Sequence, residues 1–302
     1  MSRETFRRTL KEKGKPSSKK PPSKKYEGEI LHVAKSPVVT SASTIPIYDA
    51  IQIMTKEGFR RIPIANPGTK VLEGIITATD IIDYLGGGKK FEIIEKKLGS
   101  NIFKAINEPV RLIMTKDVVA VETSARISGA INLMIEKNLG GLPVVDPQNH
   151  VRAIITERDI VNIFANKISG VKVSQLMSEK VVTALPKTTI FEAEKTMTSQ
   201  GFRRLPIISD GKVVGIVTSM DIIRFFGSGK VFEKLRSGTI IQVLNTPALE
   251  IATKEVTIIE PQADAGQAAK IMRDKNLGAI PVAENGKLVG IITERDFFKL
   301  IA

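Results

Sequence analysis

The sequence predicts a mixed α/β protein built from four copies of one unit that form two pseudo-symmetric pairs. The first observation is a segment in which a short apolar, β-branched run is followed by Thr, two variable residues, Asp and an apolar pattern of helical spacing. Its four copies are residues 74–80, 153–159, 215–221 and 290–296. The second observation is that the copies alternate: Gly-Phe-Arg-Arg precedes a proline strand in units one and three, and Asn-Leu-Gly precedes it in units two and four. This alternation favours two closed pairs over a stack of many equivalent repeats.

Each unit is expected to run strand, helix, strand, strand, helix. The predicted elements of the first unit are a strand at 38–40, a helix at 44–56, a strand at 60–64, a turn at 66–68, a strand at 71–76 and a helix at 80–85. The other units have first strands at 118–120, 181–183 and 255–257, first helices at 127–137, 190–199 and 265–274, and proline strands at 140–144, 203–207 and 278–282. Gly58 is expected to end the first helix in the left-handed conformation.

Two glycine-rich segments, 85–89 and 226–230, follow the first and third units. Each has a lysine after its glycines, but the complete phosphate-loop pattern is absent. We interpret them as helix ends with flexible links, and expect the helices that follow, 91–98 and 232–235, to pack on the repeats or on a partner. The resulting assignment is a basic segment at 1–27, units at 28–98, 108–168, 171–235 and 245–302, and modules at 28–168 and 169–302.

Composition removes several classes of function. The chain has no cysteine and only two histidines, which excludes thiolate metal sites and disfavours histidine-based zinc sites and catalytic triads. We therefore expect no metal site, no catalytic residues and no enzymatic activity. Since no run approaches the ~18–20 apolar residues of a membrane helix and no secretory signal pattern occurs, a soluble, cytoplasmic protein without membrane contact is expected.

The net charge of +13 is concentrated at the N-terminus. Residues 1–25 hold ten Lys or Arg and two Glu, a net charge of +8, among many Ser and Pro residues. This composition predicts disorder. It leaves two interpretations open, a solvated extension and a tail that binds nucleic acid or an acidic partner.

The Thr-x-x-Asp motif has a chemical interpretation of its own. Thr at a strand end and Asp in the first helical turn point towards one spot beside a helix N-terminus, where free N–H groups and the helix dipole favour anions. A hydroxyl and a carboxylate together suit a sugar diol next to a phosphate. The alternative is structural, because an Asp at a helix start also serves as an N-cap.

The four motif strands, the proline strands and the pairwise alternation resemble four CBS domains in two Bateman modules, covering roughly residues 30 to 302. The chain is similar in these features to archaeal four-CBS proteins related to the γ regulatory subunit of AMP-activated protein kinase. The resemblance implies pseudo-two-fold modules, with one disc-like assembly as an option, and adenine nucleotides bound in clefts between paired units.

The resemblance also implies the composition of each cleft: the first strand and proline-strand entry of one unit meet the Thr/Asp motif of its partner. In the first module, Thr40, Arg60 and Arg61 would meet Thr156 and Asp159, and Gly140 and Gly141 would meet Thr77 and Asp80. In the second, Thr183, Arg203 and Arg204 would meet Thr293 and Asp296, and Thr257, Gly278 and Ala279 would meet Thr218 and Asp221. Ile62, Arg158, Leu205 and Arg295 complete the predicted ligand-binding set.

By this resemblance, Asp holds the ribose diol, Thr or its backbone touches the α-phosphate, and the Arg-Arg pairs face the centre and hold phosphates. Guanidinium groups suit that role because they bind phosphate oxygens bidentately, and Gly140 and Gly141 would let an adenine ring approach closely. Two departures from the family pattern, Ala153 in place of Gly and Ala120 in place of Thr, fall in different clefts of the first module. They leave open whether both clefts are occupied.

The predicted function is a non-catalytic regulatory protein that binds AMP, ADP or ATP and senses energy state, with Mg²⁺ accompanying ATP as an open option. Two alternatives remain: a regulator that binds S-adenosylmethionine, and a ligand-controlled DNA- or RNA-binding protein that uses residues 1–25. The protein partner that would be regulated is unknown, and the sequence is compatible with a monomer or a face-to-face homodimer.

Overall fold

The computed structural model of the chain describes residues 30–233 and 239–301. The basic segment 1–27 lies outside these residues, as does the end of the helix expected at 232–235. In the described part of the chain, no helix is long and apolar enough to cross a membrane.

Each unit is built around one antiparallel β-hairpin. Its first strand begins at the Arg-Arg or Leu-Gly pair, and its second strand ends at the motif Thr. The hairpins are β1 (Arg61–Ala65) with β2 (Leu72–Thr77), β4 (Gly141–Val145) with β5 (Val151–Thr156), β6 (Arg204–Ser209) with β7 (Lys212–Thr218), and β8 (Ala279–Glu284) with β9 (Lys287–Thr293). The register pairs the first residue of each hairpin with the motif Thr, as in Arg61 opposite Thr77. The strand entry and the motif therefore always lie at the same end of the sheet.

Helices precede and follow each hairpin. The preceding helices are α2 (Ile47–Glu57), α6 (Ile127–Glu136), α9 (Ile190–Gln200) and α13 (Ala265–Asp274). The following helices are α3 (Ala78–Ile82) with the π-helical η3 (Asp83–Gly87), α7 (Glu157–Phe164), α10 (Ser219–Gly227) and the 3-10 helix η6 (Glu294–Leu300). Connecting helices are α4 (Phe91–Leu98), α5 (Ile102–Asn107), α8 (Val173–Leu176), α11 (Lys230–Glu233) and α12 (Ile240–Leu244), with single 3-10 turns η2 (Ile30–His32), η4 (Val110–Leu112) and η5 (Ala248–Glu250).

The helix predictions agree closely with the structure. The helix predicted at 44–56 begins instead at Ile47, because Pro46 takes an extended conformation at the N-cap position and disfavours a helical residue before it. Gly58 has φ 68°, so the predicted left-handed cap is confirmed. The helix predicted at 91–98 is α4.

The predicted first strands are wrong. Residues 38–40, 118–120, 181–183 and 255–257 form no strand. Backbone pairing with the hairpin begins only afterwards, at Ser41, at β3 (Val121–Glu122), at Ala184 and at Ile259. β-branched residues favour strands, but a strand also needs a neighbour to pair with, and these segments reach the sheet only at their ends.

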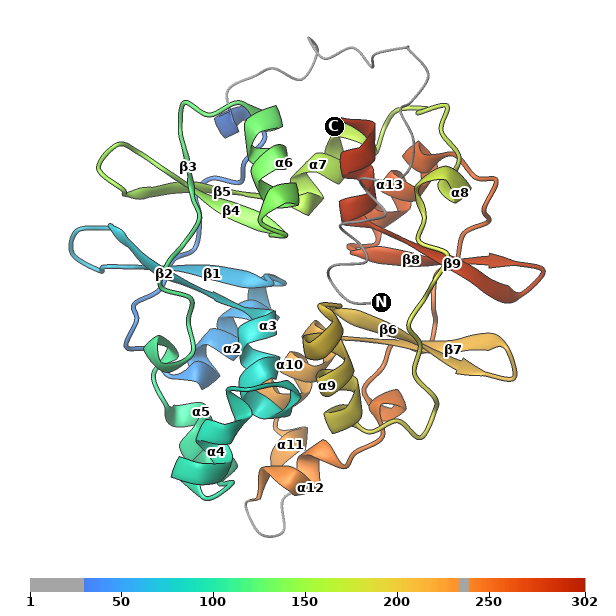
Figure 1. Cartoon of the computed structure of the whole chain (residues 1–302). Coiled ribbons are helices and arrows are strands. Elements are labelled where there is room, and N and C mark those ends of the chain that lie inside the picture. Colours follow the sequence, from blue (N-terminus) through green and yellow to red (C-terminus); the bar gives the residue numbers. More distant parts are fainter. Residues whose placement is uncertain (1–29, 234–238, 302) are drawn as a thin grey trace.

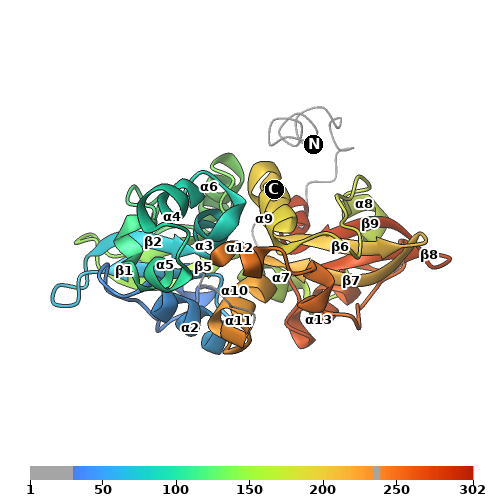
Figure 2. The ribbon, with the colours of Figure 1, turned by 90° about the horizontal axis from the view of Figure 1, so that it is seen from below.

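The four units lie around a common centre in the order one, two, four, three (Figure 1). Seen from below, the molecule is flattened into a disc (Figure 2). Units one and two meet at their hairpins, where the Leu72 amide donates to the Asn149 carbonyl (2.9 Å). Units three and four also meet through their sheets, β7 against β9. The predicted α/β fold with four units in two pairs is confirmed.

The hydrophobic cores join units that belong to different pairs. One core consists mainly of residues of units one and three, the other mainly of residues of units two and four. In the first, α2 packs against α10, and Gln52 Nε2 donates to the Gly227 carbonyl (2.7 Å). In the second, α7 packs against α13 and η6. Sheets thus close each pair, while helices join the two pairs.

The glycine-rich segment after the first unit is part of this packing. Gly86 and Gly87 are buried in η3 against α9. The Glu194 side chain of α9 lies beside them, fully buried, and neither of its carboxylate oxygens has a hydrogen-bond partner. Burial raises the pKa of the Glu194 carboxyl well above its usual value.

This carboxyl predicts an unusual pH dependence of stability. Because burial raises the folded-state pKa of Glu194, the fold is most stable below the unfolded-state pKa of about 4.3, where the carboxyl is protonated in both states, and it loses stability as pH rises towards the folded-state pKa. We expect Glu194→Met to be more stable than the native chain at pH 7, by about 1 to 3 kcal/mol, because it removes an unsatisfied buried polar group. Urea unfolding at pH 5 and pH 7 should show that the gain is smaller at pH 5. Glu136→Met, at an exposed position of α6, is the control and should show no such trend.

Candidate functional site

All four Thr-x-x-Asp motifs form the same local structure. The Thr backbone N–H and Oγ1 both donate to Asp Oδ2, with distances of 2.6–3.0 Å. The Thr side chain in turn accepts from the Asp backbone N–H, so the two residues form a capping box at the start of the helix that follows. The alternative of an Asp at the N-cap is therefore wrong in detail, because Thr is the N-cap and Asp is the third helical residue of a capping box. This arrangement leaves the second oxygen, Oδ1, of each Asp for other contacts.

The second oxygen distinguishes the four copies. Lys90 Nζ lies 2.7 Å from Asp80 Oδ1, Arg224 Nη1 lies 2.6 Å from Asp221 Oδ1, and Lys299 Nζ lies 3.0 Å from Asp296 Oδ1. In the described part of the chain, Asp159 has no ion pair. Although its bonds to Thr156 lower the pKa of Asp159, burial, the larger effect, leaves that pKa above its usual value. Asp159 is therefore the motif carboxylate whose Oδ1 can accept from a ligand without displacing a cation.

Asp159 lines a cavity of about 330 Å³ between units one and two. Thr156, Arg60 and Arg61 also line it, as predicted from the sequence, together with Arg158 and Gly140. Its apolar wall is formed by Pro37, Val38, Val39, Phe59 and Ile154, and its remaining lining by Lys35, Glu57, Gly58, Glu157, Asn162, Asn276 and Glu294. Asn276 and Glu294 belong to unit four, so this cleft reaches the centre of the disc.

Several predicted residues lie elsewhere. Thr40 is absent from the lining of this cavity, whose wall is made by the two valines before it. Ile62 and Leu205 are buried in the core shared by units one and three. Thr183 is exposed, and Thr257 Oγ1 accepts from Lys275 Nζ (3.0 Å).

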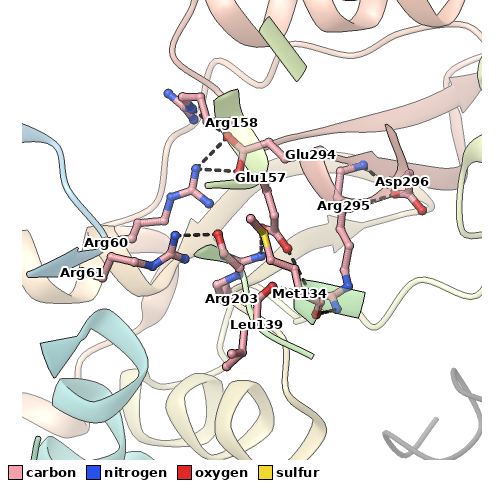
Figure 3. A network of polar contacts seen from close by, with 12 residues as sticks. Arg60, Arg61, Met134, Leu139, Glu157, Arg158, Arg203, Glu294, Arg295 and Asp296 are labelled. Atoms are coloured by element: carbon pink, nitrogen blue, oxygen red, sulfur yellow. Dashed lines mark hydrogen bonds and ion pairs between the residues drawn. The ribbon is translucent and has the colours of Figure 1, made fainter. Parts of the chain in front are cut away.

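Two glutamates that were not predicted as site residues occupy the centre. Glu157 and Glu294 follow the motif Thr of units two and four, and both are almost fully buried. Glu294 accepts from Arg60 (2.8 Å) and from Arg158 Nε (2.7 Å). Glu157 accepts from Arg203 Nη2 (2.5 Å) and from Arg295 Nη1 (3.1 Å). Figure 3 shows these guanidinium groups converging on the two carboxylates. The available signal was the Glu-Arg pair between Thr and Asp, which occurs in units two and four only.

Two further arginines are placed against the glycines of the opposite units. Arg61 donates to the Gly140 carbonyl, and a Cβ atom on Gly141 would collide with its guanidinium. A Cβ atom on Gly278 would lie 2.8 Å from Arg204 Nη2. Gly140 and Gly141 were expected to let an adenine ring approach, and in the structure the Arg61 guanidinium lies against them.

The centre holds more positive than negative charge. Six guanidinium groups surround the two carboxylates: Arg60, Arg61, Arg158, Arg203, Arg204 and Arg295. Burial and the neighbouring Arg203 lower the pKa of Arg61 to about 10. Burial, Arg203 and Arg60 lower the pKa of Arg204 to about 9. Among the described residues, Arg204 has no hydrogen-bond or ion-pair partner. Such a centre favours a bound anion.

Among the described residues, no group of three or more His, Asp or Glu is placed so that it could hold a metal ion. The arrangement instead offers a carboxylate, an apolar wall and guanidinium groups along one cleft. These are the groups that would contact a sugar diol, a flat base and a phosphate.

Comparison with known proteins identifies a family. The model of the CBS domain matches residues 28–87, 110–166, 173–228 and 248–302. Protein MJ1225 of Methanocaldococcus jannaschii, an uncharacterised protein, is 37% identical over 267 residues, which cover 88% of this chain and 95% of MJ1225. An uncharacterised 33.4 kDa protein of Thermofilum pendens, from a ribosomal RNA operon, is 31% identical over 86% of both chains.

The solved structures agree with this. The crystal structure of MJ1225, described as a candidate archaeal homologue of γ-AMPK, has a TM-score of 0.87 to this chain at 35% identity, covering 91% of this chain and all of MJ1225. An uncharacterised Pyrococcus horikoshii protein has a TM-score of 0.59 at 21% identity, covering 90% of this chain and 99% of that one, a likeness of fold.

The crowded centre predicts the effect of removing one arginine. Arg204 is partly buried beside Arg203 and Arg60, so Arg204→Met should stabilise the ligand-free protein. A gain of about 1 kcal/mol corresponds to roughly 2 °C in Tm for a chain of this size. Because the pKa of Arg204 is lowered in the folded state, the gain should be constant up to pH about 9 and shrink above it. Thermal unfolding in phosphate-free buffer checks this, with Arg111→Met at an exposed position as control. If Arg204→Met lowered Tm while Arg111→Met left it unchanged, the predicted gain in stability would be contradicted.

Proposed function

The chain belongs to the CBS-domain family, and we propose that it is a non-catalytic regulatory protein that binds adenine nucleotides. The main observation is the cavity between units one and two, in which Asp159 offers a carboxylate oxygen that has no cationic partner among the described residues. The description of MJ1225 as a candidate γ-AMPK homologue supports the same proposal.

The proposed binding mode follows the chemistry along this cavity. The base lies against the apolar wall that includes Val38, Val39 and Ile154. The ribose diol donates to Asp159 Oδ1, while Oδ2 stays bound to Thr156. The phosphate points inward to the guanidinium group of Arg61, beside Arg60, where it would form charge-assisted hydrogen bonds.

Regulation follows if nucleotides with different numbers of phosphates bind this centre with different affinities. A ligand shifts a conformational equilibrium only by the difference in its affinity for the two states. Because Arg60 and Arg158 link units one and two to Glu294 of unit four, a phosphate that draws on these arginines would alter the contact between the two modules. A protein partner would then sense the arrangement of the modules.

The binding site is tested by two matched variants. Asp159→Asn should weaken AMP binding about 10- to 100-fold, because it removes a charged hydrogen-bond acceptor from the ribose. Asp80→Asn makes the same change in the motif of unit one, but Asp80 does not line this cavity, called the first cleft below, and its Oδ1 is held by Lys90. AMP affinity at the first cleft should therefore change less than about twofold. Isothermal titration of nucleotide-stripped protein with AMP, ADP, ATP and S-adenosylmethionine measures affinity and stoichiometry.

Three outcomes would decide against parts of this proposal. Absence of heat and of any change in Tm with all four ligands would reject nucleotide binding. Binding of S-adenosylmethionine alone would replace the ligand class. Loss of AMP binding in Asp80→Asn but not in Asp159→Asn would move the site to the neighbouring cleft.

The charge of the N-terminal segment supports a second candidate function, nucleic-acid binding. Residues 1–25 carry a net charge of +8. If this segment binds DNA or RNA, affinity should fall by about a factor of ten or more between 50 and 200 mM salt and be lost on deletion of residues 1–25. Fluorescence anisotropy with a labelled duplex and a labelled single strand measures both effects. Equal binding by the truncated protein would exclude this role.

A further inference from the structure

We propose that Glu294 is a specificity determinant that limits the first cleft to a nucleoside monophosphate. The proposal rests on the function proposed above and concerns how many phosphate groups the cleft accepts. Glu157, at the same inner end of the cavity, reinforces the effect.

Glu294 occupies the guanidinium groups that a second phosphate would need. Its side chain is 2% exposed and lines the cavity at the end where the four units meet. Arg60 Nη2 lies 2.7 Å from Oε2 and donates to Oε1, and Arg158 Nε donates to Oε1 as well. Both arginines line the same cavity. The carboxylate therefore already holds them, in the place of a phosphate group.

The carboxylate is charged at neutral pH. Burial by itself raises the pKa of Glu294, but Arg60, Arg158 and Arg204 lower it to about 2. Glu157 is engaged in the same way by Arg203 and Arg295. Two fixed negative charges thus stand at the inner end of the cleft, each with its arginines.

Arg61 is the remaining guanidinium of the cleft. It lines the cavity, donates to a backbone carbonyl and has no ion pair in the part of the chain that the structure describes. One guanidinium without a carboxylate partner matches one phosphate group, since the bidentate contact uses two of its N–H donors. A second phosphate would have to approach the Glu294 carboxylate or take Arg60 or Arg158 from it. Both alternatives are unfavourable in a site where charges are weakly screened.

The order of affinities in the native protein is the first test. Isothermal titration should give the tightest binding for AMP, weaker binding for ADP and the weakest for ATP, with AMP about tenfold or more tighter than ATP. ATP is titrated with and without MgCl₂, because a bound magnesium ion would neutralise part of the phosphate charge. ATP binding as tight as AMP binding in the absence of magnesium would overturn the proposal.

Glu294→Gln is the second test. It keeps the shape of the side chain, removes the charge and releases both arginines, so the ratio of the ATP and AMP Kd values should fall about tenfold or more. The control is Glu92→Gln, which makes the same charge change at an exposed residue of α4 and should leave the ratio unchanged. An unchanged ratio in Glu294→Gln would overturn the proposal even though nucleotides still bind.

Two further arms keep the test decisive. Glu294→Gln removes a buried ion pair, so the folding of this variant is checked by circular dichroism. If Glu294→Gln does not fold, Glu157→Gln takes its place, and it should shift the ratio of the two Kd values in the same direction. If neither variant folds, the order of AMP, ADP and ATP affinities in the native protein is the test, and ATP binding as tight as AMP binding overturns the proposal. A native protein that binds no nucleotide fails the proposed function itself, and is thereby distinguished from one that binds without regard to phosphate number.

Discussion

Two buried carboxylates hold the centre of this molecule together. Glu157 and Glu294 bind arginines from all four units. A buried carboxylate without its partners would be strongly unfavourable, so the positions of the four lobes are coupled through these pairs. The pairing is incomplete in the other direction, because six guanidinium groups face two carboxylates. The same interactions that fix the lobes therefore leave a positively charged centre, and the cleft between units one and two opens onto it.

The four copies of the motif are alike in backbone and unlike in chemistry. In every copy the motif Asp accepts from the N-cap Thr through Oδ2, which is a local consequence of the Thr-x-x-Asp spacing. What distinguishes them is the group on Oδ1: Lys90, Arg224 and Lys299 in three copies, and no ion pair at Asp159 in the described chain. Repetition in the sequence thus reports a common fold, whereas the neighbours of each copy determine whether it can bind a ligand.

Structural features that depend on residues close in sequence could be predicted, and contacts between residues far apart in sequence could not be predicted from spacing. Hairpins, caps and helices depend on residues within a few positions, and they were predicted from spacing. The meeting of Arg60 and Arg61 with Thr156 and Asp159 was predicted from the family resemblance. The role of Glu294 could not be, because its partners Arg60 and Arg158 lie more than a hundred residues away and a charged residue after a strand is usually solvated. The predictions of the first strands were wrong for a related reason, since β propensity does not show whether a pairing neighbour is present.

The interleaved cores have a consequence for synthesis. Helix α2 of unit one buries its apolar face against α10 of unit three, which begins at Ser219. On a ribosome that adds about 5 to 20 residues per second, α2 waits roughly ten to thirty seconds for its packing partner to emerge. During that interval the apolar face of α2 in the nascent chain is not covered by α10. The two modules are therefore not independent folding units, because each core is completed only when the second module has been made.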